Sequence, residues 1–167
     1  MPPIVVLGLG SNLGDRKAAL EEALRLLGAR GLRVTRRSSV WQTAPVGGPP
    51  QGWFLNAVVA GETDLSPEEL LEACLETERE MGRVREERNG PRLIDVDILQ
   101  FGDLVREGPG LTLPHPRLHE RRFVLEPLFE IAPGLRHPVL GLTVAELRER
   151  CPDDSAVRLF SDVEATA

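Results

Sequence analysis

Two aspartates, Asp95 and Asp97, stand in an otherwise apolar stretch, and their type and spacing could do chemistry. They belong to the segment RLIDVDILQF, residues 92–101. If residues 93–101 form a strand, alternate side chains share a face, and these two carboxylates lie side by side with Cα atoms about 6.5 Å apart. Aspartate is unfavourable in strands and like charges repel, so the pair needs cations. Mg²⁺ fits, because it takes one or two carboxylates together with phosphates and waters.

The alternative is a pair of solvated aspartates bridged to arginines on an exposed sheet face. The nearby cations favour a phosphate site instead, because the planar fork of arginine matches phosphate oxygens. They are Arg83, Arg85, Arg88 and Arg92 before the strand, and Arg121 with His115 in the segment LPHPRLHERRF. Carboxylates for metal beside arginines for phosphate are the parts that phosphoryl transfer needs.

The glycine-rich segment GLGSNLGDR, residues 8–16, is a weaker candidate for holding phosphate. Gly14 is followed by Asp15 and Arg16, so the lysine and hydroxyl of a Walker loop are missing. The glycine spacing also departs from the dinucleotide-binding fingerprint. We interpret the segment as a tight turn before a helix that Asn12 or Asp15 caps.

His115 and His119 could suggest zinc. Pro116 disfavours a regular helix through both, and no third ligand stands nearby, so zinc is the weaker interpretation.

The elements that must position these residues follow from hydrophobic periodicity and capping signals. We predict strands over residues 4–9, 32–42, 54–63 and 93–101, helices over 15–27 and 66–81, and short helices around 120–131 and 143–150. The order β-α-β-β-α-β is typical of an α+β, ferredoxin-like antiparallel sheet with two helices on one face, followed by a short C-terminal helical extension. The other face should be free to carry a site.

In the last strand, alternation divides the side chains between the two faces. Ile94, Val96 and Ile98 should pack on the helices. Leu93, Leu99 and Phe101 should share the opposite face with the two aspartates.

Composition limits the class of protein. The 167 residues, 41% of them hydrophobic, are expected to form one domain, residues 1–167. The net charge of −6 argues against general nucleic-acid or membrane-surface binding. No signal peptide and no apolar run of about 20 residues is evident. Two cysteines are too few for a disulfide framework, so we expect a cytoplasmic protein with Cys74 in the core. The sequence carries no signal for an oligomeric state.

Three segments together carry a resemblance to a known family. GLGSNLGDR, GPRLIDVDIL and LPHPRLHERRFVLEPLFEIAP resemble hydroxymethyl-dihydropterin pyrophosphokinases of folate biosynthesis, over residues 4–133. The resemblance implies a ferredoxin-like fold. It also implies transfer of pyrophosphate from ATP to the hydroxymethyl group of 6-hydroxymethyl-7,8-dihydropterin, with release of AMP and with two Mg²⁺ ions held by Asp95 and Asp97.

The resemblance also implies which residues bind the substrates. Catalytic residues would be Arg83, Arg92, Asp95 and Asp97. ATP would contact Leu71, Glu78, Arg83, Arg85, Arg88, Arg92, Ile98, Leu111, Thr112, His115 and Arg121. The pterin would contact Thr43, Val46, Phe54, Asn56 and Phe123.

These roles suit the residue types. Phe54 and Phe123 can sandwich a flat ring, and Asn56 can donate and accept at the lactam edge. The loops at residues 44–52 and 82–92 would close and exclude water. Asn89 and Pro116 stand where some members carry aromatic residues. Asparagine cannot stack on the substrates in the same way, so we expect pterin affinity or the ordering of the loop that carries Asn89 to differ.

Two other classes of function fit part of the same pattern. Ferredoxin-like sheets also serve as RNA-binding modules and as ligand sensors that do not consume their ligand. An ordinary kinase would transfer only the γ-phosphate. Only the pyrophosphokinase requires AMP as a product.

Overall fold

The computed structural model describes residues 3–44, 53–82 and 93–160, and its centre is a six-stranded sheet. The strands pair antiparallel in the order β5-β1-β4-β3-β6, and β2 also pairs with β4. Their bounds are β1 Ile4–Ser11, β2 Leu32–Arg37, β3 Trp41–Thr43, β4 Phe54–Thr63, β5 Asp95–Phe101 and β6 Val157–Leu159. β4 organises the sheet, because β1 pairs along one of its edges while β2 and β3 share the other.

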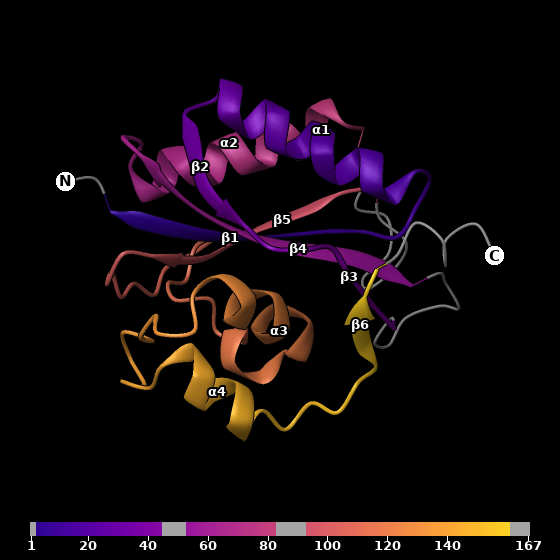
Figure 1. The fold of residues 1–167 in the computed structure, drawn as a ribbon. Coiled ribbons are helices and arrows are strands. Elements are labelled where there is room, and N and C mark those ends of the chain that lie inside the picture. The colour runs from indigo at the N-terminus through magenta and orange to yellow at the C-terminus, as the bar shows by residue number, and fades with distance from the viewer. Residues whose placement is uncertain (1–2, 45–52, 83–92, 161–167) are drawn as a thin grey trace.

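Helices cover both faces of this sheet (Figure 1). The first pair, α1 (Arg16–Ala29) and α2 (Pro67–Glu80), lies on one face. The second pair, α3 (Arg122–Ile131) and α4 (Val144–Arg150), lies on the opposite face, after the short 3₁₀ helix η1 (Leu118–Glu120). Among the described residues, no helix combines the length and apolar character that crossing a membrane requires.

The helix starts follow from local capping residues, as the sequence predicts. The Asp15 carboxylate accepts from the Ala18 backbone N–H at 3.1 Å and caps α1. Reciprocal capping boxes open α2 (Ser66 with Glu69) and α4 (Thr143 with Glu146). Each cap satisfies backbone N–H groups that the first helical turn leaves without a partner.

Two hydrophobic cores share the sheet. The first lies between the sheet and α1 and α2, and contains Leu7, Leu20, Leu70, Ile94 and, as predicted, Cys74. The second lies between the sheet and α3 and α4, and contains Val6, Val58, Leu99, Leu125 and Leu147. The expectation of an open second face is therefore wrong over the part that α3 and α4 cover.

The segment predicted as one strand over residues 32–42 is two strands. Ser38 interrupts it: its N–H donates to the Val58 carbonyl and its hydroxyl accepts from the Val58 N–H, both at 2.9 Å. Before this break β2 pairs with the C-terminal half of β4, and after it β3 pairs with the N-terminal half. A second irregularity lies within β2, between Val34 and Arg36.

A bulge in β5 changes the predicted alternation of its side chains. The strand begins at Asp95, not at residue 93, and its register with β1 shifts: Leu7 pairs with Ile98, but Val6 pairs with Gln100. One extra residue on the bulged strand reverses the faces of those that follow. Phe101 therefore lies in the first core, with Ile98, and the prediction that it shares the aspartate face is wrong.

Candidate active site

A pocket of about 530 Å³ opens on the second face of the sheet, beside the start of α3. Its floor and walls come from β1, β3, β4 and β5, from residues 117–124, and from the C-terminal segment. Of the residues expected at a site, the structure brings these to the pocket: Thr43, Phe54, Asn56, Asp95, Asp97, Arg121 and Phe123.

Two glycines of β1 form the floor of the pocket. Gly8 pairs with Asp97 on one side and with Val58 on the other. Gly10 pairs with Asp95 on one side and with Asn56 on the other. Directly opposed residues have Cβ atoms about 5 Å apart, so each glycine leaves a gap one side chain wide between the carboxylates and β4.

A side chain at either glycine would crowd its neighbours, more severely at Gly10 than at Gly8. A Cβ at Gly10 would lie 2.9 Å from Asn56 Oδ1, closer than real Cβ atoms approach. A Cβ at Gly8 would lie 3.3 Å from Leu99 Cδ1. The strand predicted over residues 4–9 extends to Ser11, so the interpretation of residues 8–16 as a turn beside a capped helix is correct only for its second half. The alternate glycines at positions 8 and 10 are the signal in the sequence for a floor without side chains.

The amide side of the pocket is fixed by hydrogen bonding. Asn56 is 7% exposed, and its Nδ2 donates to the Thr43 hydroxyl at 2.8 Å. This bond leaves the Asn56 carbonyl oxygen directed toward the glycine floor, as the close approach to Gly10 shows. Phe54 and Phe123 add aromatic surface to the walls. The Arg121 guanidinium carbon lies 5.5 Å from the Phe123 ring centroid, a cation–π contact.

The carboxylate side depends on β5 and on the helix beneath it. Asp95 and Asp97 share the pocket face and are both half-buried. On the other side of the sheet, the buried Glu78 of α2 accepts from the Val96 backbone N–H at 2.9 Å. Val96 lies between the two aspartates, so this bond fixes the strand that presents them.

Positive charge meets the carboxylates from residues 115–121. Burial and then Arg117 lower the pKa of Arg121, while Asp97 and Asp95 act in the opposite direction. Burial, Arg121 and Arg117 lower the pKa of His115 to about 4. His115 is therefore a neutral imidazole at pH 7. Its Nδ1 accepts from the Arg117 N–H at 3.1 Å, which places its proton on Nε2.

The remaining residues expected to contact ATP lie outside the pocket wall. Ile98 belongs to the first core, and Leu71 and Leu111 pack against it. Glu78 lies under β5, and Thr112 is half-buried in the segment before His115. The His115 N–H donates to the Leu99 carbonyl at 2.8 Å and ties that segment to β5. Five expected residues lie outside the described parts of the chain: Val46, Arg83, Arg85, Arg88 and Arg92.

Sequence reasoning missed several residues of the pocket wall. Arg117 and Glu120 come from the histidine-containing segment, whose charges were a visible signal. Pro152, Asp153 and Ser155 come from the C-terminal end, which no local pattern connects with the site.

The residues present fit a magnesium–phosphate site. Within residues 3–44, 53–82 and 93–160, no three His, Cys, Asp or Glu side chains converge as a metal site. Mg²⁺ does not need such a cage, because one or two carboxylates with substrate phosphates and waters complete its octahedron. Asp95 and Asp97 supply two carboxylates, and Arg121 supplies a guanidinium for phosphate oxygens.

Comparison with known proteins points to a single family. The family model for 7,8-dihydro-6-hydroxymethylpterin-pyrophosphokinase matches residues 6–133. The chain is 52% identical over 141 residues to a 2-amino-4-hydroxy-6-hydroxymethyldihydropteridine pyrophosphokinase of Methylorubrum extorquens, covering 84% of this chain and 88% of that protein. It is 48% identical over 132 residues to the protein of the same name in Bacillus subtilis, covering 78% and 79%.

Longer proteins contain a similar unit. The chain matches the folic acid synthesis protein fol1 of Schizosaccharomyces pombe at 40% identity over 162 residues, which cover 96% of this chain but 22% of that protein. A solved structure of Plasmodium falciparum HPPK-DHPS with pteroate superposes with a TM-score of 0.72 at 15% identity, covering 90% of this chain and 44% of that one. The last likeness concerns the fold alone.

Proposed function

The chain belongs to the 7,8-dihydro-6-hydroxymethylpterin-pyrophosphokinase family, and we propose that the reaction of this family takes place in the pocket on its sheet. The protein transfers pyrophosphate from ATP to the hydroxymethyl group of 6-hydroxymethyl-7,8-dihydropterin and releases AMP, a step of tetrahydrofolate biosynthesis. The assignment rests mainly on Asp95, Gly10 and Asn56, which lie opposite one another on three neighbouring strands. A carboxylate and an amide that can recognise a ring therefore stand on either side of a glycine in the pocket floor.

The β5 side of the pocket binds the nucleotide. Asp95 and Asp97 hold Mg²⁺, and we propose two ions. When bound, the metal neutralises phosphate charge and aligns the triphosphate for displacement. Arg121 adds a fixed guanidinium, and neutral His115 adds an N–H donor. Leu71, Glu78, Ile98, Leu111 and Thr112, which lie outside the pocket wall, would surround the nucleoside where it extends past β5.

The β4 side of the pocket binds the pterin. Asn56, held by Thr43, donates and accepts at the amide edge of the ring. Phe54 and Phe123 stack on its faces. This arrangement brings the hydroxymethyl oxygen toward the carboxylates. The hydroxymethyl oxygen releases its proton to solvent and forms a bond to the β-phosphorus, the bond from that phosphorus to the α–β bridging oxygen breaks, and AMP leaves with the bridging oxygen.

Two loops complete the proposal. Arg83, Arg85, Arg88 and Arg92 would contact the triphosphate, with Arg83 and Arg92 catalytic, and Val46 would contact the pterin. All five lie outside the described residues. Closure over both substrates would exclude water and align the attacking oxygen.

We also infer the finer features of the fold and its setting. The strand order β5-β1-β4-β2 supports a ferredoxin-like topology, with α3, α4 and β6 as the C-terminal extension. We propose that residues 1–167 form one pyrophosphokinase domain. The two free cysteines, Cys74 and Cys151, support a cytoplasmic location.

One assay separates this function from its alternatives. The protein is mixed with Mg²⁺, ATP and 6-hydroxymethyl-7,8-dihydropterin, and the nucleotides are separated by chromatography. Pterin-dependent AMP is expected. ADP would instead indicate a γ-phosphate kinase, and binding of both ligands without turnover would indicate a sensor.

The metal assignment is tested by Asp97→Asn. The variant keeps the size of the side chain but loses its charge, and we expect turnover to fall about a hundredfold or more. Asp103→Asn, on an exposed residue of the turn after β5, is the matched control and should keep full activity. Chelation with EDTA should abolish turnover of the wild type and leave its circular dichroism unchanged. Near-wild-type turnover of Asp97→Asn would remove Asp97 from the metal site.

A further inference from the structure

The start of α3 is capped by a residue from far along the chain. Arg121 occupies the N-cap position, but its side chain makes no capping bond. Instead, the backbone N–H of Arg122 donates to Asp153 Oδ2 at 3.0 Å. A carboxylate there satisfies a free N–H group and interacts favourably with the helix dipole. The two residues that flank Arg122 are Arg121 and Phe123, both in the pocket wall.

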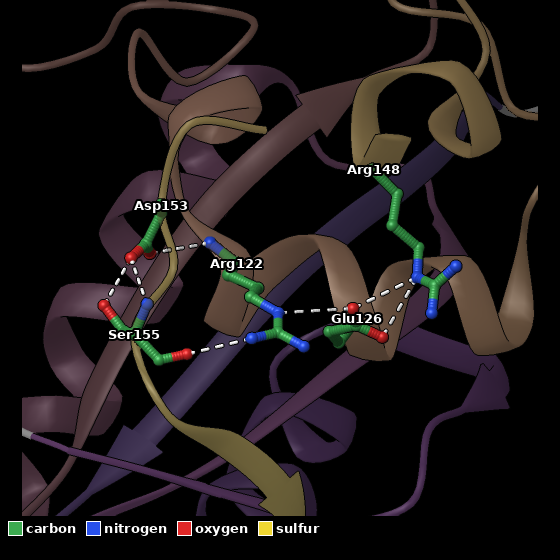
Figure 2. A network of polar contacts seen from close by, with 5 residues as sticks. All are labelled: Arg122, Glu126, Arg148, Asp153 and Ser155. Atoms are coloured by element: carbon green, nitrogen blue, oxygen red, sulfur yellow. Dashed lines mark hydrogen bonds and ion pairs between the residues drawn. The ribbon is translucent and has the colours of Figure 1, made fainter. Parts of the chain in front are cut away.

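Asp153 is itself held in place by its neighbours (Figure 2). Its Oδ1 accepts from the Ser155 N–H at 2.9 Å and from the Ser155 hydroxyl. The Ser155 carbonyl in turn accepts from Arg122 Nη1 at 3.1 Å. Burial acts to raise the pKa of Asp153, but the hydrogen bonds from Ser155 and Arg122 outweigh it and lower the pKa. Asp153 is thus a charged acceptor at neutral pH.

A second carboxylate extends the same network into α4. Glu126 is buried and pairs with Arg122 Nε at 3.5 Å and with Arg148 Nε at 3.0 Å. The Arg122 side chain is therefore held between Glu126 and Ser155, as Figure 2 shows. Removing one partner from a half-buried set of charges leaves the others without compensation. The network makes the first turn of α3 depend on the segment at residues 153–155.

That segment lies at the edge of the proposed pterin pocket. Pro152, Asp153 and Ser155 line it. The chain then enters β6, where Val157 pairs with Thr43, the residue that orients Asn56. The family model ends at residue 133, so this wall comes from outside the matched region.

We propose that Asp153 is a positioning residue for the pterin, acting through the first turn of α3 on the Phe123 ring. The inference rests on the proposed function of the pocket. In this role Asp153 acts through α3 and not on the reacting atoms. It fixes the helix start that presents Phe123, and its segment closes the wall on that side.

The test compares Asp153→Ala with Asp154→Ala. Asp154 is exposed and adjacent, and its substitution makes the same change in charge. Binding of 6-hydroxymethylpterin is measured by calorimetry, and KM and kcat by AMP release. We expect Asp153→Ala to raise the pterin Kd and the pterin KM about five- to tenfold, the size of a lost helix cap. Asp154→Ala should leave both unchanged.

A double-mutant cycle tests whether Asp153 acts through Phe123. In a Phe123→Ala background, Asp153→Ala should have little further effect on pterin affinity, because the ring it positions is gone. Additive losses would overturn the proposal, since they would mean that Asp153 acts elsewhere. If Asp153→Ala fails to fold, Ser155→Ala removes one donor to the same carboxylate and should shift the pterin Kd in the same direction.

The measurements distinguish an error in the proposed function from an error in the role of Asp153. A wild-type protein that binds no pterin contradicts the proposed function. A wild-type protein that binds and turns over pterin, with Asp153→Ala indistinguishable from Asp154→Ala, contradicts the positioning role alone.

Discussion

At the scale of single residues, the glycine floor explains how one strand can separate the proposed metal-binding carboxylates from an amide. Gly10 lies between Asp95 and Asn56, and the absence of its side chain lets the Asn56 carbonyl oxygen approach the backbone. The strand itself is continuous and well paired. Its contribution to binding is the space above it, into which a flat ring can settle.

Gly10→Ala should weaken pterin binding with little change in the fold. The added Cβ would stand 2.9 Å from Asn56 Oδ1, so the amide must shift, and we expect this to break its 2.8 Å bond to Thr43. We expect the pterin Kd to rise about tenfold or more, corresponding to a lost buried hydrogen bond of about 1–2 kcal/mol. Calorimetry with 6-hydroxymethylpterin measures this change.

Gly28→Ala is the control for that substitution. A Cβ at Gly28, within α1, meets no atom within 4 Å. It should leave pterin affinity unchanged and raise the free energy of unfolding by roughly 0.5–1 kcal/mol, because alanine is the better helix former. Equal pterin affinity in Gly10→Ala and Gly28→Ala would contradict the account of the floor.

The sequence is informative about residues whose side chains take part in the proposed site. It is much less informative about glycines, whose contribution is the absence of a side chain. Strand alternation placed Asp95 and Asp97 on one face without knowledge of any partner strand. The role of Gly10 depends on Asn56, which lies 46 positions along the chain and opposite it only after β1 and β4 pair. No local pattern carries that relation.

At the scale of elements, predictions succeeded where the cause is local. The caps at Asp15, Ser66 and Thr143 depend on residues three positions apart, and all three helices begin where the sequence predicts. The break at Ser38 and the bulge in β5 depend on the strands alongside, so alternation within one strand could not predict them.

The turn between α3 and α4 should make stability depend on pH. His137 is 5% exposed, and its Nδ1 accepts from the N–H groups of Val139 at 3.2 Å and Leu140 at 3.0 Å. Burial, and then the neighbouring His119, lower the pKa of His137 below 6.5. The unfolded chain therefore binds more protons, so this contribution is complete above about pH 6.5 and is lost as the pH falls toward the folded pKa.

His137→Asn isolates this effect, because Oδ1 of asparagine can replace Nδ1 as an acceptor and does not titrate. Urea unfolding at pH 7.5 and pH 5.5 should show a smaller loss of stability at the lower pH in the variant than in the wild type. His115, whose pKa is about 4, contributes to both proteins alike. An identical pH dependence in the two proteins would rule out His137 as its source.

At the scale of the whole molecule, the pocket joins parts that are distant in sequence. Its wall includes β1, β4 and β5 of the sheet, the start of α3, and the segment before β6. The covering of the second face by α3 and α4 was not predicted, because their docking depends on apolar contacts assembled from the entire sheet. Substrates bound in the proposed site should therefore hold the sheet and the second helical layer together.

This arrangement predicts additive ligand stabilisation. At about 100 times its Kd, a ligand contributes about 2.7 kcal/mol, which should raise the thermal unfolding midpoint by roughly 5–10 °C for a chain of this size. Scanning fluorimetry would use 6-hydroxymethylpterin and a non-hydrolysable Mg²⁺–ATP analogue. Asp97→Asn should lose the shift caused by the nucleotide and keep the shift caused by the pterin. Loss of both shifts would show that Asp97 supports the whole pocket.

The bare floor has a consequence for inhibitors and for resistance to them. A compound that lies flat across Gly8 and Gly10 contacts main-chain atoms, which no substitution can take away. At these two positions a variant can act on such a compound only by adding atoms, and a Cβ at Gly10 would lie 2.9 Å from Asn56 Oδ1, so the amide must shift. Because we propose that the pterin ring binds the same amide, resistance arising at Gly10 should come with weaker binding of the pterin.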